Sequence, residues 1–409
     1  MGVDPITSPD IDKRALRAVA VQFFANGATI ATIVPRLPDL QEQVDVSIGT
    51  LGVVLTIGSL ASLIGVLFAG RVVAQAGSRR VLIYGGVLSI GFLPVIGLAT
   101  SPVLLAFGLF GLLFFDIFID VAMNVQGSAL SARRHTPVMN RLHGLWSLGA
   151  VTGGLVTVVS LRADVSVAAQ FSVVAIVLIV VLRLVAPGLL RSDDDPTVDA
   201  SDAIAPGLVS EEAVAPEAAS PRSSGGVLSF AGLILGIGGA AAMSIEMTNT
   251  DWAAFRLGDD LGAAPGAAGL GFVIFSGAMT VGRLSGDFVQ VRVGPLALIR
   301  GASVLILIGA VLATLIDSVP VSIVGFLIGG LGTAVLFPQL YDRAARWPGP
   351  PGSGFAAMLV GQRGSAVATP ALVGALANTD AFSVGQAMAI VIIPAALAIM
   401  ATTFARPPG

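Results

Sequence analysis

Residues 101–131 read SPVLLAFGLFGLLFFDIFIDVAMNVQGSALS, an apolar run long enough to cross a bilayer as a helix at about 20 residues per span. Asp116, Asp120 and Asn124 interrupt this run at intervals of four residues, so they share one helix face, with Gly127 near the next turn. A carboxylate at the bilayer midplane costs roughly 2.5–3.5 kcal/mol on insertion scales, and such residues usually face a bundle interior or a wet cavity. The run therefore predicts a membrane helix that lines a transport pathway.

The composition of the whole chain is that of a polytopic membrane protein. Of its 409 residues, 55% are hydrophobic and only 11% are charged, whereas a soluble protein carries about 25% charged residues. The 50 glycines favour close packing of helices, because small residues let backbones approach one another in lipid. The absence of Cys excludes disulfides and thiolate metal sites, and two His residues are too few for a metal cluster. We therefore expect a lipid bilayer around the chain, and no cofactor, metal or nucleic acid.

Apolar segments recur along the chain and predict an all-α polytopic membrane protein with twelve transmembrane helices. The segments lie near residues 15–37, 47–70, 80–100, 102–130, 139–160, 165–187, 226–250, 264–288, 295–316, 319–341, 353–377 and 381–404. Residues 81–115 carry no charge and are too long for one span, but the sequence ATSP at 99–102 predicts a turn that divides them into a hairpin.

The segment between the sixth and seventh spans divides the chain. Residues 188–226 are rich in Ala, Pro, Ser and acidic residues and have too little apolar content to fold, so we interpret them as a disordered cytoplasmic linker. The linker separates an N-terminal six-helix bundle, residues 15–187, from a C-terminal six-helix bundle, residues 227–404. Residues 1–14 are expected to be a disordered cytoplasmic N-terminus, and residues 405–409 a cytoplasmic tail.

Basic residues indicate the orientation of the chain in the membrane. With both termini in the cytoplasm, all 22 Lys and Arg residues except four fall on the cytoplasmic side, while the external loops are acidic. The exceptions are Arg36, Arg162 and Arg256 in external loops and Arg363 within a span. Basic residues directly before the first span indicate a membrane anchor rather than a cleaved signal peptide.

The two halves of the chain match each other when one is shifted by 217 residues. The shift places Gly49, Gly52, Ser59, Gly65 and Gly77 over Gly266, Gly269, Ser276, Gly282 and Gly294. This internal repeat predicts two pseudo-symmetric bundles, parallel copies related about the membrane normal, with a substrate site between them at mid-depth.

The short basic turn after the second span resembles a loop of the major facilitator superfamily. It reads GRVVAQAGSRR at residues 70–80, against the family pattern Gly-x-x-x-Asp-Arg-x-Gly-Arg-Arg. Ala74 and Gln75 stand where the family has Asp and Arg, and the second copy of the loop, residues 282–294, retains an acidic residue. The six-plus-six helices extend the resemblance over essentially the whole chain. It implies gating loops that include Gly70, Gly77, Arg79, Arg80 and Asp287.

Three further motifs resemble a bacterial subgroup of this superfamily related to the fucose-permease type. They read DVAMNVQ at residues 120–126, HGLWS at 143–147 and DWAA at 251–254. Residues 149–154, GAVTGG, resemble the antiporter motif Gly-Pro-x-x-Gly-Gly, with Ala150 in the place of Pro. The subgroup resemblance implies a monomeric, proton-coupled transporter of a sugar-like solute in the bacterial cytoplasmic (inner) membrane.

Carboxylates within spans are the candidates for proton coupling. Asp116 and Asp120 lie one turn apart, and two carboxylates so close cannot both ionise cheaply in a low dielectric. One of them is therefore expected to bind a proton near neutral pH, although an interhelical hydrogen bond is the structural alternative. Glu246 in the seventh span is the C-terminal counterpart. It is also the expected partner of Arg363, in a pair that is either structural or a switch.

Polar residues within or beside spans are the candidates for binding substrate. Asn124 shares the aspartate face, and a structural role for it is equally open; Gln126 points elsewhere and is interpreted as a contact between helices. His143 can exchange protons, and Trp146 can stack on a sugar ring. A position at the cytoplasmic membrane interface explains both residues slightly better. Asp251 is interpreted as lying at the external interface. The substrate-binding candidates are Asn26, Asn124, His143, Trp146, Asn249, Gln339 and Arg363.

The sequence thus predicts a secondary transporter that moves a small polar organic solute by proton-coupled alternating access. Within transport, the alternative is efflux of drugs or metabolites by proton antiport. From another class, the alternative is a membrane sensor or scaffold that does not transport. The chain has no phosphate-binding Gly loop followed by Lys and no nucleophile with a base at useful spacing, so we do not expect an enzyme.

Overall fold

The computed structural model describes residues 9–134, 138–191, 230–345 and 353–404, and in these residues the regular secondary structure is helical. The N-terminal half contains α1 (Pro9–Ile33), the short α2 (Leu37–Gln43), α3 (Ile48–Ala76), α4 (Ser78–Gly97), α5 (Pro102–Arg133), α6 (Met139–Arg162) and α7 (Val167–Val185). The C-terminal half contains α8 (Phe230–Phe255), the short α9 (Pro265–Ala268), α10 (Leu270–Val293), α11 (Pro295–Ala310), α12 (Val319–Thr333), α13 (Leu336–Ala345), α14 (Ser353–Ala377) and α15 (Val384–Thr402).

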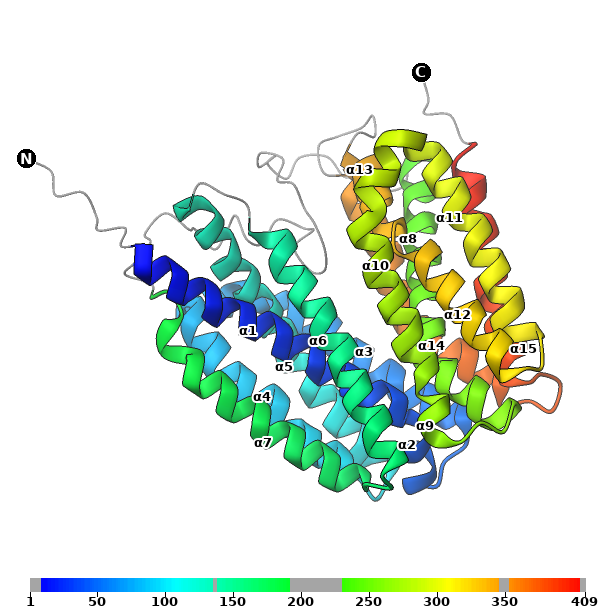
Figure 1. The fold of residues 1–409 in the computed structure, drawn as a ribbon, viewed down its shortest axis with the longest axis horizontal. Helices are drawn as coiled ribbons and strands as arrows, with labels where there is room; N and C mark the ends of the chain where they lie inside the picture. Colours follow the sequence, from blue (N-terminus) through cyan, green and yellow to red (C-terminus); the bar gives the residue numbers. More distant parts are fainter. Residues whose placement is uncertain (1–8, 135–137, 192–229, 346–352, 405–409) are drawn as a thin grey trace, which may run out of the picture.

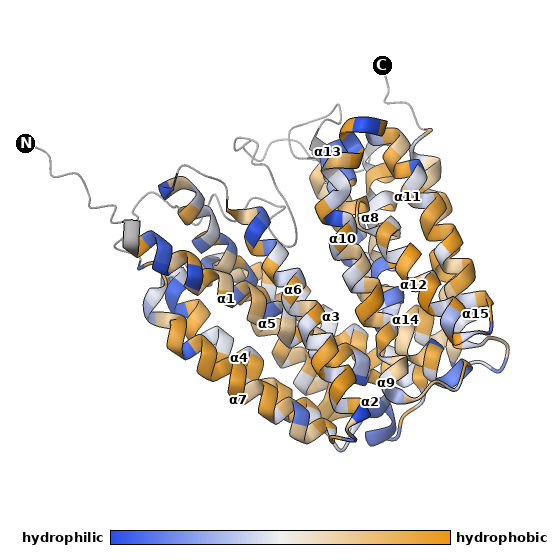
Figure 2. Cartoon of the chain, viewed as in Figure 1, coloured by the Kyte–Doolittle hydropathy of each residue, from blue (hydrophilic) through white to orange (hydrophobic). Residues whose placement is uncertain are grey.

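The helices follow the twelve predicted spans. Each predicted segment corresponds to one long helix, except that residues 319–341 form the consecutive helices α12 and α13. Within the described residues, ten helical stretches are long and apolar enough to cross a membrane. Hydrophobic residues run along the lengths of the helices and hydrophilic residues gather at their ends (Figure 2). The prediction of an all-α membrane protein is confirmed.

Two predicted boundaries need correction. Helix α1 begins at Pro9, so residues 9–14 are helical rather than disordered; Asp12 ties this turn to α5 by accepting a 2.9 Å hydrogen bond from Arg133. At the start of the expected linker, Leu189 and Leu190 are buried against the N-terminal bundle. The other residues predicted to be disordered, 1–8 and 192–226, lie outside the described residues, as does the predicted cytoplasmic tail, 405–409.

The two halves repeat the same helix packing, as the internal repeat predicts. Helix α1 packs on α6 as α8 packs on α14, and α4 contacts α5 and α7 as α11 contacts α12 and α15. Gly77 ends α3 with φ +83°, and Gly294, 217 residues later, ends α10 with φ +81°. Only glycine adopts this backbone conformation without steric cost, so both turns depend on it.

Glycines allow the first and fifth helices of each half to pack backbone against backbone. A Cβ atom at Gly149 would overlap the backbone carbonyl oxygen of Phe24 on α1, and a Cβ at Gly361 would overlap the carbonyl oxygen of Gly236 on α8. This packing accounts for the first glycine of the GAVTGG sequence by close helix approach.

The halves converge at one end and diverge toward the other, where α1 begins and α15 ends (Figure 1). At the convergent end, α3 of one half packs along α14 of the other. Thr56 donates a 2.9 Å hydrogen bond to the backbone oxygen of Val367, and the backbone nitrogen of Gly49 donates a 3.4 Å bond to Asn378. The structure is therefore closed at the end that contains α2 and α9, which the distribution of basic residues predicts to be external.

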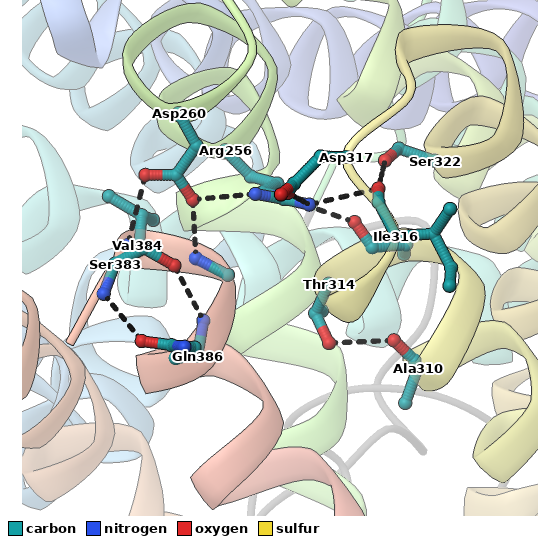
Figure 3. Close-up of polar contacts among 12 residues, drawn as sticks. Arg256, Asp260, Ala310, Thr314, Ile316, Asp317, Ser322, Ser383, Val384 and Gln386 are labelled. Carbon is teal, nitrogen blue, oxygen red and sulfur yellow. Dashed lines mark hydrogen bonds and ion pairs between the residues drawn. The ribbon is translucent and has the colours of Figure 1, made fainter.

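A buried arginine lies at the convergent end of each half, directly after its first long helix. Arg256 follows α8 and donates to Asp260 at 2.9 Å, to Asp317 at 3.0 Å and to the carbonyl oxygens of Ala313 and Ile316 at 3.2 and 3.0 Å (Figure 3). Because the turn after α8 and the segment before α12 meet on one guanidinium, Arg256 holds this corner of the C-terminal half together.

Asp260 extends the same cluster to the last helix. Its carboxylate accepts hydrogen bonds from the backbone nitrogens of Val384 and Gly385 at 3.1 and 2.7 Å, at the start of α15 (Figure 3). A carboxylate is favourable there, because helix N-termini present unsatisfied N–H groups and a positive dipole end.

Arg36 plays the corresponding part in the N-terminal half. It donates to Gln170 at 2.8 Å, to Asp39 at 2.8 Å and to the carbonyl oxygen of Val165. Both arginines lie in the regions predicted to be external loops, but each is almost wholly buried because these acceptors replace water around it.

Acidic side chains of the two halves approach one another at the convergent end. Partial burial raises the pKa of Asp259 to about 6, and the carboxylates of Asp260 and of Glu42, on α2 of the other half, act in the same direction. The negative charge of Asp259 is therefore unfavourable in this closed arrangement.

Candidate functional site

A chain of hydrogen bonds joins three helices of the N-terminal half. Trp146 on α6 donates its indole N–H to the side-chain oxygen of Asn26 on α1 at 2.7 Å, and the amide nitrogen of Asn26 donates to Asp116 on α5 at 2.6 Å. Asn26 is held in one amide orientation, because it accepts from the indole and donates to the carboxylate. The indole N–H of Trp146 therefore points into the bundle, and its position at the cytoplasmic interface stays a prediction.

Asp120 continues this polar face one turn further along α5. Asn124 donates to the backbone oxygen of Asp120 at 2.9 Å and to its carboxylate at 3.3 Å. Asp120 also interacts electrostatically with Asp116 and, across the divide between the halves, with Arg363 on α14. The four-residue spacing correctly predicted the shared face of these acidic residues.

A pocket of about 240 Å³ lies between the halves and is lined from α1, α3, α5, α8 and α14. Its wall is mostly apolar, with the hydroxyls of Ser59 and Ser62 and two charged side chains, Asp251 and Arg363. Leu113 lines the pocket from α5, and the two aspartates of that helix follow it on the same face at helical spacing. The aspartate face of α5 therefore continues along that helix from the wall of the pocket, and we call the pocket and this face together the central site.

Asp251 is a site residue that the sequence interpretation missed. We predicted it at the external interface, but it lines the pocket, where Thr250 donates a hydrogen bond to its carboxylate at 3.1 Å. Met243 and Met247 line the same wall at intervals of four residues. That spacing placed Asp251 on an interior helix face and was the signal that could have found it.

Glu246 has a partner that we did not predict. Its carboxylate forms an ion pair of 3.6 Å with Arg283 on α10. Asp120 and Tyr341 act on Arg363 electrostatically. Glu246 therefore lies against Arg283, and its pairing with Arg363 stays a prediction.

Of the seven predicted substrate-binding residues, only Arg363 is among those that line the pocket, and three of the other six have contacts elsewhere in the bundles. Asn249 is buried and donates to the backbone oxygen of Ile245 on its own helix at 2.8 Å. His143 packs edge-on against Phe23, with ring centroids 5.2 Å apart. Gln339, on α13, donates to Gln290 of α10 at 2.7 Å. The contact of Asn249 is thus within its own helix, and those of His143 and Gln339 are with neighbouring helices.

The predicted gating loop is a tight turn between two helices. Gly70 is buried within α3, Gly77 forms the turn, and Arg79 and Arg80 lie in the first turn of α4. Asp287 lies within α10. A gating role for these residues stays a prediction.

Gln126 supports this turn from α5. Its amide donates to the Ser78 hydroxyl at 2.9 Å and to the backbone oxygen of Leu190 at 3.1 Å, and it accepts from the Leu190 nitrogen at 3.0 Å. The interpretation of Gln126 as a contact between helices is confirmed. Among the described residues, no three His, Cys, Asp or Glu side chains are grouped to hold a metal ion.

Comparisons with known proteins agree with this arrangement. A family described as the Major Facilitator Superfamily matches residues 19–235. An uncharacterized transporter, y4wD, of Sinorhizobium fredii (strain NBRC 101917 / NGR234) is 29% identical over 88% of the chain and 91% of the relative.

Two solved structures share the fold at 12% sequence identity. They are a nucleoside transporter NupG mutant, with a TM-score of 0.73 over 95% of this chain and 98% of that one, and a D-xylose-proton symporter, with a TM-score of 0.70 over 95% and 97%. At this identity the likeness shows the fold alone.

Proposed function

Since the chain belongs to the major facilitator superfamily, we propose that it is a secondary transporter that moves a small polar organic solute together with protons by alternating access. Family membership establishes a multi-pass membrane transporter rather than an enzyme. The solute class, the proton and the direction of transport belong to the proposal.

The observation that carries the proposal is the position of Asp116 and Asp120 between the halves. Two carboxylates one helical turn apart, beside a largely apolar pocket, favour a state in which they share one negative charge and bind a proton. Alternating access closes one end of such a site while it opens the other. A proton taken up there from one side is therefore released to the other side when the halves rock.

The surroundings of the aspartates support a hydroxylated solute. Asn26 and Trp146 supply an amide and an aromatic face, and the pocket adds two serine hydroxyls. The volume of about 240 Å³ is below the roughly 300–1,000 Å³ of pockets that hold drug-sized ligands. This favours a solute of sugar-like size over a bulky drug.

Proton-antiport efflux is supported less well. Its motif, residues 149–154, lacks the proline, and a packing role already accounts for Gly149 and Gly153, which face the carbonyl oxygens of Phe24 and Ala28. Paired acidic residues beside a pocket also favour transport over a sensor or scaffold role.

The test is proton-driven uptake into proteoliposomes, with labelled monosaccharides, nucleosides and sugar acids as probes. We expect the wild type to concentrate one class of probe when a proton gradient is imposed. Asp120→Asn should lose this accumulation by at least tenfold but still exchange labelled for unlabelled solute, because binding and rocking do not require the proton. Asp116→Asn should be milder.

The matched control is Asp164→Asn, in a loop after α6, where φ is +50° and Asn is well tolerated. It should transport like the wild type. If Asp120→Asn concentrates the probe at the normal rate, Asp120 is not the coupling residue.

A further inference from the structure

We propose that Asp251 binds the transported solute by accepting hydrogen bonds from its hydroxyl groups at the convergent end of the pocket, and that this contact selects a neutral, polyhydroxylated solute. The inference rests on the proposed function and names the residue and the solute groups that confer specificity. It follows from three observations: the position of Asp251 in the pocket, the few hydrogen-bond donors around its carboxylate, and the mixture of side chains in the pocket wall.

Asp251 lies at the end of the pocket where the halves converge. Helices α8 and α14 run in the same direction, because the hydroxyls of Ser244 and Ser365 are hydrogen-bonded at 2.6 Å and, further along both helices, a Cβ atom at Gly374 would lie 3.3 Å from the Trp252 side chain. Asp251 directly precedes Trp252 and is about two helical turns beyond Ser244. At this level α14 is packed on α3 of the other half, so Asp251 lies close to the closure of the pocket.

The carboxylate of Asp251 receives little hydrogen bonding from the protein. Thr250 donates its hydroxyl to it at 3.1 Å, but the same hydroxyl lies 3.1 Å from the backbone oxygen of Met247. A hydroxyl has one hydrogen to donate, whereas a carboxylate has about four acceptor positions. In the part of the chain that the structure describes, the Thr250 hydroxyl is the one donor bonded to this carboxylate. A carboxylate away from bulk water is costly unless it is hydrogen-bonded, so donors from a solute stabilise it.

The pocket wall directs the polar groups of a solute to a few positions. Most of the lining side chains have no N–H or O–H group and can only cover C–H faces. The hydroxyls in the lining are those of Ser59 and Ser62, both on α3, and Ser62 donates to the backbone oxygen of Leu113 at 3.4 Å. The apolar lining residues include Ile33, Val34, Leu37, Leu55 and Met247.

The charges in the wall favour a neutral solute. Asp251 lines the pocket from α8 and Arg363 lines it from α14, so the lining contains one acidic and one basic side chain. A cationic solute is repelled by the basic side chain and an anionic solute by the acidic one, whereas a neutral solute meets neither repulsion. Hydroxyl groups suit both side chains, because they donate to a carboxylate and accept from a guanidinium. Uncharged sugars combine these features with apolar ring faces.

The experiment measures sugar binding to the purified full-length protein in detergent by thermal shift. The probes are D-glucose, D-galactose, D-xylose and D-ribose, each with its monodeoxy analogues, and the cationic sugars D-glucosamine and D-galactosamine. We expect at least one neutral sugar to stabilise the wild type. At least one of its monodeoxy analogues should bind about tenfold more weakly or worse, because a hydrogen bond to a charged group is lost. The amino sugars should not bind more tightly than their neutral parents.

Variants of Asp251 test whether that hydroxyl meets this carboxylate. Asp251→Asn should weaken binding of the sugar by about tenfold or more, because an amide is uncharged and has one acceptor oxygen. In this variant the sensitive monodeoxy analogue should bind about as weakly as the sugar itself, because the missing hydroxyl has already lost its partner. A purely structural effect would instead weaken both and leave the ratio of their affinities at the wild-type value. Asp251→Glu, which keeps the carboxylate, should bind the sugar with intermediate affinity.

The matched control is Asp45→Asn, which makes the same change at an exposed aspartate in the turn after α2. Its φ is +51°, a conformation that Asn tolerates well. This variant should bind every probe like the wild type. If Asp251→Asn does not fold, the same comparison of sugar and monodeoxy analogue is made with Asp251→Glu, whose carboxylate is displaced by one methylene.

The inference is overturned if none of the sugars binds, if every monodeoxy analogue binds as tightly as its parent, if an amino sugar binds more tightly than its neutral parent, or if the affinity ratio of sugar to analogue is unchanged in the folded Asp251 variants. Proton-driven accumulation of a sugar that depends on Asp120 but not on Asp251 would overturn this inference and leave the proposed transport intact. Absence of both binding and proton-driven accumulation would overturn both.

Discussion

Replacing Arg256 with Gln should be among the most destabilising single changes at the convergent end. The side chain is 1% exposed and donates four hydrogen bonds, to two carboxylates and two backbone carbonyl oxygens, at 2.9–3.2 Å. Gln is shorter and uncharged and cannot reach all four acceptors. Asp260 would then keep only the backbone N–H groups at the start of α15.

The expected magnitude follows from the burial of the two partners. Removing one member of a buried, hydrogen-bonded ion pair typically costs about 3–5 kcal/mol, because the other charge stays buried. The contribution of Asp317 is much smaller, since its side chain is 86% exposed and an exposed ion pair is worth about 0–1 kcal/mol. Arg256→Gln should therefore lower the free energy of unfolding by about 3–5 kcal/mol, and Asp317→Asn by less than about 1 kcal/mol.

The assay is reversible unfolding of the purified protein in mixed detergent micelles, followed by helical circular dichroism. Asp317→Asn serves as the matched control, because it changes the exposed partner of the same arginine. A loss below about 1 kcal/mol for Arg256→Gln, or equal losses for the two variants, would refute the assignment of Arg256 as the residue that holds this corner.

Three further predictions concern other parts of the chain. Asp259→Asn should be more stable than the wild type above pH 6 and equal to it near pH 4, measured by thermal unfolding. The pKa of Asp259 in the folded state, about 6, lies above its ordinary value of 3.8, so the wild type loses stability as the pH rises through the folded-state pKa. A stability difference between the variant and the wild type that is largest at low pH would contradict this. Gly149→Val should reduce the yield of folded protein, judged by size exclusion, because the new Cβ would overlap the backbone of the adjacent helix. Gly301→Ala should not reduce this yield, because a Cβ at that position meets open space. Glu246→Gln and Arg283→Gln should each destabilise the protein by more than about 1 kcal/mol but couple in a double-mutant cycle; additive losses would show that the ion pair contributes nothing.

Local pattern was enough to predict much of the fold. Hydrophobic length located the spans, and the 217-residue repeat predicted two bundles with matching turns at Gly77 and Gly294. The four-residue spacing placed Asp116, Asp120 and Asn124 on one face, because the rotation per residue of a helix does not depend on its neighbours. Composition placed the start of α1 too late. The first turn of this helix includes Asp12, and the residue that stabilises the turn, Arg133, is on another helix.

Partners across helices were decided only by the tertiary structure. The sequence contained Glu246, Arg363 and Arg283 but not the rotation of each helix about its axis, which determines which charges meet. That rotation depends on close contacts such as Gly361 against Gly236, distant in sequence and set by the shape of both backbones. Helix rotation brought Arg363 toward Asp120 of the other half and turned Asp251 into the pocket. In a low dielectric, each buried charge is stabilised by the groups packed around it rather than by its neighbours in the chain.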